Sequence, residues 1–487
     1  MRERRRETGR FTRTVATHRA KLPAADDPDI LLGVSGGWGM AFTIRWAHRG
    51  LGAAACALAA WSAWGQTPQQ RELCYRTTAA DEQTITGCTA VIQGGNESQQ
   101  ELATAYYNRG IGYQNKKDYD RALADYDQAL KLRPNYSSAY NNRGNVFQSL
   151  GKYERAIEDY DQASHIAPGD HLPYNNRGNA WRRLGKTEKA IADLDQAIRL
   201  KPDYADAYEN RGLVYYDMRD WDRSLKDYDE SIRLKPNNPD AYNNRGLSYA
   251  AKGDWDRALA DYDQALALKP AMPETYNNRG IAWRNKGYYD KAIKDYDEAI
   301  RLQPDYAYAF NNRGNAWRYK GDYARALDDF SAALRLKPDY GLALRNRALV
   351  YEARQDWNSA IRDLQEATRV NPRDAGAWNS LCWQRAVNGR MERALADCNE
   401  GLRIDPNHVE MLDSRAFTEL KLGLYDAAIS DYTDVLKFRP NKEESLYGRG
   451  LARRATGDKA GGDADIEAAL KIRSDVPKDF EKWGVTP

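Results

Sequence analysis

A proline recurs at an interval of 34 residues, ten times in succession, and this interval constrains the fold more than any other feature of the chain. The prolines are Pro134, Pro168, Pro202, Pro236, Pro270, Pro304, Pro338, Pro372, Pro406 and Pro440. A fixed period of roughly 20 to 50 residues indicates one supersecondary unit stacked many times. The chain is therefore predicted to form a solenoid, in which each unit buries its apolar face only against its neighbours.

Each unit has the pattern of two short helices. A frame that starts at Ala103 gives eleven units over 103–476, with small residues eighth and twentieth in the unit. Large apolar residues stand fourth, eleventh, twenty-first and twenty-fourth, for example Tyr242, Tyr249, Leu259 and Tyr262. These spacings place one apolar stripe on each of two helices, and the proline ends the second helix. The predicted fold class is all-α.

The pattern resembles the tetratricopeptide repeat, which carries an aromatic, Gly, aromatic, Ala, aromatic and Pro over 34 residues. One unit reads Tyr276, Gly280, Trp283, Ala292, Tyr296 and Pro304. The resemblance covers about three quarters of the 487 residues and implies a right-handed superhelical solenoid of helix-turn-helix repeats. Two features depart from the family: Arg is the usual seventh residue, and the ninth unit has Cys382, Arg385 and Cys398 in place of Gly and two aromatics.

The termini are predicted to be separate segments. Residues 1–39 are Arg-rich without periodicity and are interpreted as a disordered or misassigned extension, which leaves open whether Met1 or Met40 is the true start. Residues 40–65 have a charged start, an apolar run and a small-residue cleavage site, as a signal peptide does. A membrane anchor, or a lipoprotein site at Cys56, is the alternative. A degenerate capping hairpin is predicted over 66–102 and a capping segment over 477–487.

The charge balance argues against a nucleic-acid partner. The whole chain has a formal net charge of +3, but residues 1–65 hold ten basic and five acidic residues. Without that segment the net charge is −2. A nearly neutral solenoid lacks the basic surface on which binding to phosphate backbones depends.

Four cysteines are expected to form two local disulfides. Because only neighbouring repeats touch in a solenoid, Cys74 is expected to pair with Cys88, and Cys382 with Cys398. Disulfides persist in oxidising compartments, so this pairing favours a periplasmic or secreted protein without a stable membrane span. Free core cysteines in a reducing cytosol are the alternative.

No catalytic or metal-binding pattern is evident after residue 65. His165, His171 and His408 have no metal-ligand spacing with cysteines or carboxylates, and no Gly-x-Ser-x-Gly elbow occurs. In the recurrent Asp-Tyr-Asp strings, the two carboxylates splay apart on a helix and cannot share a cation. We therefore expect a protein that is not an enzyme and that needs no cofactor.

Two rows of polar residues recur instead. The seventh residue is Arg in ten of the eleven units, and the twenty-third is Asp in all eleven, which predicts Arg–Asp pairs within or between repeats. An arginine row for an anionic ligand is the alternative. The sixth residue is Asn in eight successive units: Asn108, Asn142, Asn176, Asn210, Asn244, Asn278, Asn312 and Asn346.

The resemblance gives the asparagines a functional interpretation. In superhelical tetratricopeptide proteins, an asparagine at the matching position lines the concave groove and binds extended peptide, so these eight are the candidate ligand-binding residues. A primary amide both donates and accepts, which suits a peptide backbone. The alternative is that Asn recurs because the repeats duplicated recently. Because Ala is the better helix former, Ala in place of Asn is expected to leave stability unchanged or improved.

The favoured function is a non-enzymatic scaffold that binds a protein or an extended peptide in its concave groove. The first alternative is the specificity or adaptor subunit of an envelope enzyme or polysaccharide-export complex. The second is a carbohydrate-binding solenoid that uses the aromatic residues of the groove.

Overall fold

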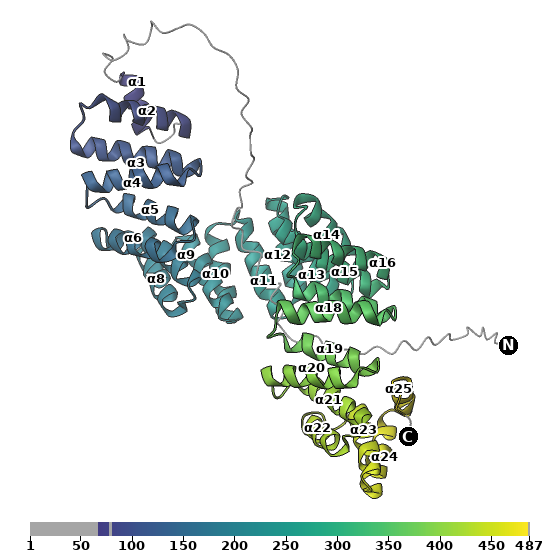
Figure 1. The fold of residues 1–487 in the computed structure, drawn as a ribbon. Coiled ribbons are helices and arrows are strands. Elements are labelled where there is room, and N and C mark those ends of the chain that lie inside the picture. Colours follow the sequence, from purple (N-terminus) through teal and green to yellow (C-terminus); the bar gives the residue numbers. More distant parts are fainter. Residues whose placement is uncertain (1–66, 77–79, 486–487) are drawn as a thin grey trace, which may run out of the picture.

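The computed structural model describes residues 67–76 and 80–485. Helices are the only regular secondary structure in these two ranges, and they follow one another in pairs along the chain (Figure 1). The predicted all-α right-handed superhelical solenoid of helix-turn-helix repeats is confirmed. The predicted extension over 1–39 and signal peptide over 40–65 lie outside the described residues.

The helices of the structure have regular bounds. Their order is α1 (Pro68–Tyr75), α2 (Asp81–Gly94), α3 (Gln99–Asn115), α4 (Tyr119–Leu132), α5 (Ser137–Ser149), α6 (Tyr153–Ile166), α7 (His171–Arg183), α8 (Thr187–Leu200), α9 (Ala205–Asp217), α10 (Trp221–Leu234), α11 (Pro239–Ala251), α12 (Trp255–Leu268), α13 (Pro273–Asn285), α14 (Tyr289–Leu302), α15 (Ala307–Lys320), α16 (Tyr323–Leu336), α17 (Gly341–Ala353), α18 (Trp357–Val370), α19 (Ala375–Val387), α20 (Met391–Ile404), α21 (Val409–Leu422), α22 (Tyr425–Phe438), α23 (Glu443–Ala455), α24 (Lys459–Ile472) and α25 (Val476–Lys482).

Repeat 1 (103–136) holds α3 and α4, and each later repeat holds the next two helices, up to α23 and α24 in repeat 11. Within a repeat, the eighth residue lets the two helices approach closely. In repeat 5, a Cβ at Gly246 would lie 2.7 Å from the Tyr262 ring, which is fully buried. The turn between the helices places its fifteenth residue in the left-handed region, which glycine adopts most readily, as Gly253 does with a φ of 78°.

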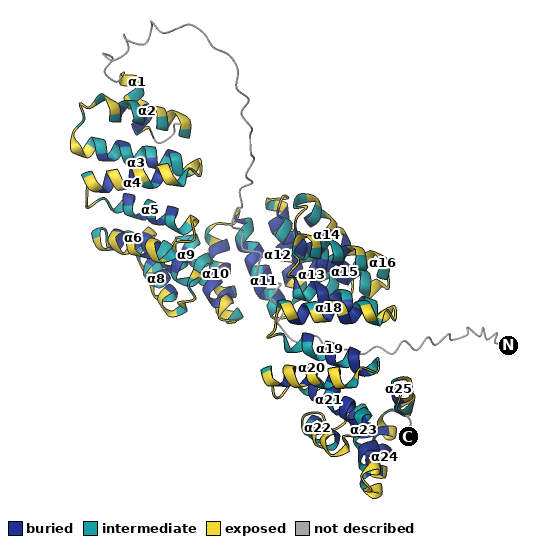
Figure 2. Ribbon diagram, in the orientation of Figure 1, coloured by how far each residue is buried: buried dark blue, intermediate teal, exposed yellow. Residues whose placement is uncertain are grey.

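The buried residues form a chain of small cores instead of one large core. Several cores join the two helices of one repeat to the first helix of the next, as Ala250, Tyr262 and Ala282 do. A larger core runs through repeats 9 to 11 and includes α25. In Figure 2 the buried stretches recur in the helix pairs, and exposed residues alternate with buried ones along second helices such as α4 and α20. Stability therefore depends on contacts between nearest neighbours, as expected for a solenoid.

The first helices of the repeats form what we call the inner face. Most first helices contact the first helix of the following repeat, for example α7 with α9 and α19 with α21, whereas the second helices of successive repeats have no comparable contact. The stack therefore curves toward the first helices, and their exposed sides line its concave side. Side chains that connect the first helix of one repeat to the first helix of the next therefore lie along the inner face.

Candidate functional site

The Arg and Asp rows form bidentate ion pairs inside the repeats. In all ten units with Arg at the seventh position, Nε and Nη2 donate to the two carboxylate oxygens of the twenty-third residue, at 2.6 to 2.9 Å. Arg245 with Asp261 is typical, with the carboxylate side chain 7% exposed. The predicted pairing is confirmed, and the carboxylate of the same repeat takes two of the guanidinium donors.

The third guanidinium nitrogen connects successive repeats. Arg245 Nη1 donates to Asp229 of the preceding repeat at 2.7 Å, and Arg279 does the same to Asp263. The two carboxylates of an Asp-Tyr-Asp string therefore bind different arginines, one in their own repeat and one in the next. This arrangement explains why the string recurs without forming a cation site, and it connects each first helix to two second helices.

Repeat 9 keeps the ion pair although its seventh residue is Leu381. Arg385, one helical turn later, donates from Nη1 to both carboxylate oxygens of Asp397 at 2.8 and 2.6 Å. Burial raises the pKa of Asp397 to about 6, although Arg385 opposes that effect. From the sequence, Arg385 at the eleventh position was only a departure from the family pattern. In the structure it takes the place of the seventh-position arginine in the ion pair with Asp397.

The same repeat replaces the Gly–Tyr contact between its helices by a disulfide. Cys382 and Cys398 occupy the eighth and twenty-fourth positions, with Cα atoms 5.4 Å apart and bonded sulfurs. Cys74 and Cys88 are joined in the same way between α1 and α2, with Cα atoms 4.5 Å apart. Both cysteine pairs match those expected from the sequence.

The eight asparagines lie on the inner face, in contact with the preceding repeat. The Nδ2 of each donates to the oxygen of a residue 34 or 35 positions earlier, at 2.9 to 3.4 Å. The acceptors are the backbone oxygen of Cys74 and the side chains of Tyr107, Asn141, Asn175, Glu209, Asn243, Asn277 and Asn311. The asparagine row is therefore a series of hydrogen bonds between successive first helices, which we call the amide ladder.

Exposure divides the amide ladder into two halves. Asn244, Asn278, Asn312 and Asn346 are buried, with 3 to 9% of their surface exposed. Asn108, Asn142, Asn176 and Asn210 are half-buried. Only the first half of the ladder therefore has asparagine residues that are partly exposed.

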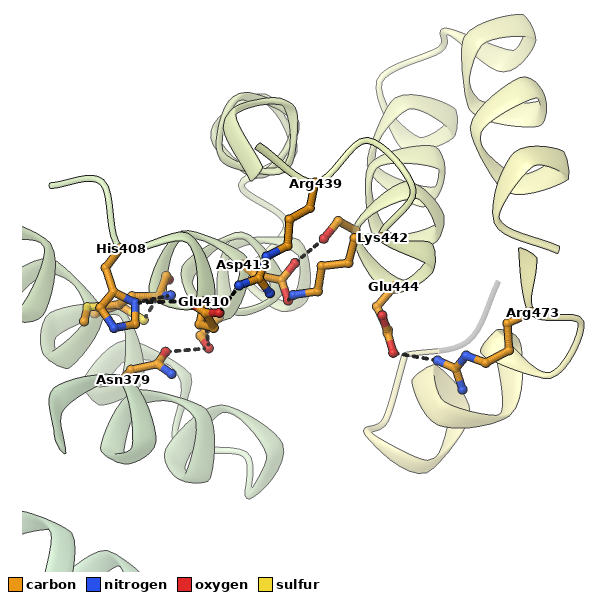
Figure 3. A network of polar contacts seen from close by, with 12 residues as sticks. Asn379, His408, Glu410, Asp413, Arg439, Lys442, Glu444 and Arg473 are labelled. Atoms are coloured by element: carbon orange, nitrogen blue, oxygen red, sulfur yellow. Dashed lines mark hydrogen bonds and ion pairs between the residues drawn. The ribbon is translucent and has the colours of Figure 1, made fainter. Parts of the chain in front are cut away.

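The amide ladder ends between repeats 8 and 9 and is replaced by other contacts. Ser380 Oγ donates within its own helix, to the Gly376 carbonyl, so no ladder bond from it reaches repeat 8. Ser414 then donates to Asn379 at 2.9 Å, and Lys442 binds Asp413 at 2.6 Å. Figure 3 shows these contacts in the last repeats. The sequence showed that the asparagines end after repeat 8, but it did not predict the contacts that replace them.

One carboxylate interrupts the row of amide acceptors. Glu209 accepts from Asn238 Nδ2 at 2.7 Å and from Asn244 Nδ2 at 3.4 Å. Burial raises the pKa of Glu209 to about 7, and the carboxylates of Asp240 and Asp206 add to that effect. Sequence reasoning missed this group; its signal was a Glu at the fifth position, where six other units have Asn.

Over residues 67–76 and 80–485, no group of three or more His, Cys, Asp or Glu side chains is placed to hold a metal ion. In the same ranges, no helix is both long and apolar enough to cross a membrane.

The fold and the bonds between repeats define a solenoid of helical repeats. Comparison of the sequence with models of known protein families identifies the kind of repeat. Models of the tetratricopeptide repeat match residues 103–136, 137–170, 210–273, 246–309, 307–340 and 345–409, and a TPR repeat model matches 178–219. With short gaps, these matches run from 103 to 409, which is well over half of the chain. The protein therefore belongs to the tetratricopeptide repeat family.

Solved structures of the same kind resemble parts of the chain. The TPR protein YrrB, whose structure is described as having an unusual peptide-binding site, is 26% identical over 39% of this chain and 97% of its own, with a TM-score of 0.33. The MamA protein is 31% identical over 35% of this chain and 93% of its own, with a TM-score of 0.31. A tetratricopeptide repeat protein from Parabacteroides merdae is 19% identical over 51% of this chain and 98% of its own, with a TM-score of 0.42. No curated protein matches the sequence.

Proposed function

We propose that this protein is a non-enzymatic interaction scaffold whose inner face binds an extended peptide segment of a partner protein. The observation that carries the proposal is the amide ladder, which follows the inner face over repeats 1 to 8 without interruption. Amide groups at a regular spacing match the donors and acceptors of a peptide backbone and do not depend on its side chains. The coarser statement, a protein-interaction scaffold, follows from the repeat family.

The half-buried asparagines are the direct contacts in this proposal. Asn210 uses one Nδ2 hydrogen for the preceding repeat, to Asn175, which leaves the second hydrogen for a ligand. Asn142 donates to Tyr107 and also contacts Tyr126, so its contribution is through its Oδ1. Asn176 donates to both Asn141 and Asn145, so its contribution is through its Oδ1. The buried asparagines from Asn244 to Asn346 hold the spacing of the first helices and thereby the shape of the inner face.

The experiment compares two triple variants that lose the same number of ladder bonds. The test variant is Asn142→Ala, Asn176→Ala and Asn210→Ala. The control changes the buried residues, Asn278→Ala, Asn312→Ala and Asn346→Ala. The ligand is a short peptide selected on the wild-type protein from a random peptide display library, and its affinity is measured by titration.

We expect both variants to lose stability by about 1 kcal/mol for each bond removed, because each alanine breaks a contact between repeats. The affinity for the peptide should fall markedly in the test variant and little in the control. Equal affinities in the wild type and both variants would contradict the proposal, and the asparagines would then have only a structural role. A selection that returns no peptide, while glycans or an envelope enzyme bind the protein, would favour the alternatives.

We also propose that the protein is exported to the periplasm or secreted. The two disulfides support this proposal, because such bonds persist in oxidising compartments. The signal-peptide prediction for 40–65 agrees with it.

A further inference from the structure

The C-terminal helix leaves the stack and lies on the inner face. The regular alternation would place α25 against α24, but its main helix contact is with α23, the first helix of repeat 11 (Figure 1). The Trp483 ring lies 5.0 Å from that of Trp383 in α19 and 5.6 Å from that of Phe417 in α21. This short segment therefore spans the first helices of three successive repeats.

The surface beneath α25 differs from the rest of the inner face. Trp383 and Phe417 are the ninth residues of repeats 9 and 10, and the Phe480 ring contacts Phe417 and Tyr447 at 5.9 and 4.9 Å. The ninth residues of the other repeats are Ile, Leu or Asn: Ile111, Asn145, Asn179, Leu213, Leu247, Ile281, Asn315, Leu349 and Leu451. Aromatic ninth residues thus occur only where a helix covers the inner face.

Polar contacts fix both ends of the docked segment. Lys421 Nζ donates to the Trp483 carbonyl at 2.6 Å and to the Ala386 carbonyl at 3.2 Å, so a lysine of repeat 10 binds the carboxyl end of α25. Before the helix, Arg473 of repeat 11 donates to Glu444 of the same repeat at 2.7 Å (Figure 3). It also donates to Asp479 of α25 at 2.6 Å. The surface thus recognises two aromatic residues three positions apart, a carboxylate and a helix end.

The helical structure of α25 is coupled to its docking. A helix of seven residues does not persist alone in water, so α25 depends on the surface that it covers. Only Val476 and Phe480 are buried within it. The aromatic rings of Phe480 and Trp483 and the bond from Lys421 hold the docked state, and a competing helix with the same aromatic spacing gains the same contacts.

We propose that the inner face of repeats 9 to 11 is a binding site for a short amphipathic helix of a partner protein, with two aromatic residues three positions apart, and that α25 occupies this site until the partner displaces it. The site is distinct from the amide ladder of repeats 1 to 8, which suits an extended peptide. The inference rests on the proposed function only in placing partners on the inner face. A permanent cap, which never leaves, is the competing explanation.

The test uses the full chain and a fluorescent synthetic peptide of residues 471–485 as the probe. The variant Phe480→Ala/Trp483→Ala removes the aromatic anchors of α25 but keeps the surface beneath it. We expect the variant to bind the probe at least about tenfold more tightly than the wild type, because the apparent affinity of a site falls with the fraction of molecules in which it is occupied. The control, Lys478→Ala/Lys482→Ala, changes exposed residues of the same helix and should bind like the wild type.

Two further measurements make the result decisive. Adding Phe417→Ala to the anchor variant should abolish probe binding, because the probe then lacks its aromatic contact in repeat 10. If the anchor variant does not fold, the proposal is tested by amide hydrogen exchange of the wild-type protein. The probe is added at about millimolar concentration, which matches the effective concentration of a tethered segment. Displacement of α25 by the probe should then accelerate exchange in residues 476–483. Equal probe affinity in the wild type and the folded variant, or unchanged exchange, would show a permanent cap. That result leaves the amide-ladder proposal intact, since the probe does not involve it.

Discussion

Replacing Glu209 by Gln should make the protein more stable at neutral and alkaline pH, with little effect in acid. The carboxyl group lies in a row of amide acceptors, between the first helices of repeats 4 and 5, and burial raises its pKa from 4.5 to about 7. Asn238 and Asn244 donate to different oxygens of Glu209, so a Gln side chain keeps an acceptor for one of the two asparagines, and it carries no charge. The substitution therefore restores the chemistry that the neighbouring repeats have at this position.

The sign of the effect follows from proton linkage. A carboxyl group with a raised pKa binds its proton more tightly in the folded state than in the unfolded state. Stability is therefore lost as the pH rises from about 4.5 to about 7, and the loss is complete above that range. With these values, the cost of the charged Glu209 is about 1 kcal/mol at pH 5 and about 3 kcal/mol at pH 8.

The assay is thermal unfolding, followed by circular dichroism at pH 5 and at pH 8. For a chain of this length unfolding as one unit, about 3 kcal/mol corresponds to an increase in Tm of roughly 3 °C at pH 8, and of more if only part of the solenoid unfolds. Glu158→Gln, at an exposed position of α6, serves as the control and should show no such dependence on pH. An increase in the Tm of Glu209→Gln that is equal at the two pH values would refute the reasoning, because a charge effect must follow titration.

Two further predictions follow from the ion pairs and the disulfides. Asp261→Ala should lower the free energy of unfolding, measured by chemical denaturation, by about 1–3 kcal/mol, because Arg245 then keeps only Asp229 as a partner and remains half-buried. Arg245→Leu introduces the residue that the family usually has and should cost less. Equal and negligible losses in the two variants would mean that the ion pair is merely solvated. Protein expressed from Met40 and recovered outside the cytoplasm should start near Gly65, and non-reducing peptide mapping should show both local disulfides. Reduction of each disulfide should lower the local stability by about 3 kcal/mol. Free thiols at all four cysteines would contradict the export proposal.

The structure changes one expectation about the amide ladder. From helix propensity alone, Ala in place of the asparagines should be neutral or favourable, since Ala is the better helix former. The structure shows that every one of the eight amides donates to the preceding repeat, and four of them are buried. Their removal leaves acceptors such as Asn277 without a partner, so we expect a loss of stability. The ligand-binding role of the asparagines stays a prediction.

The sequence by itself determined the features that depend on one repeat and its period. The proline interval and the apolar spacings define the two helices, because a period of 3.6 residues and a helix-ending proline act locally. The pairing of Arg245 with Asp261, and the joining of Cys382 to Cys398, also follow from the sequence, since both pairs lie within one helical hairpin. These contacts need only the packing of two helices that are adjacent in the chain.

Only the tertiary structure decided how successive repeats meet. The bond from Asn278 to Asn243 depends on the rotation between repeats, which no spacing within one repeat specifies. The same holds for the raised pKa of Glu209, which arises from burial between two first helices. The position of α25 could not be predicted from the sequence, because a seven-residue helix is not stable alone. Its position depends on the packing of its aromatic end against Trp383 and Phe417.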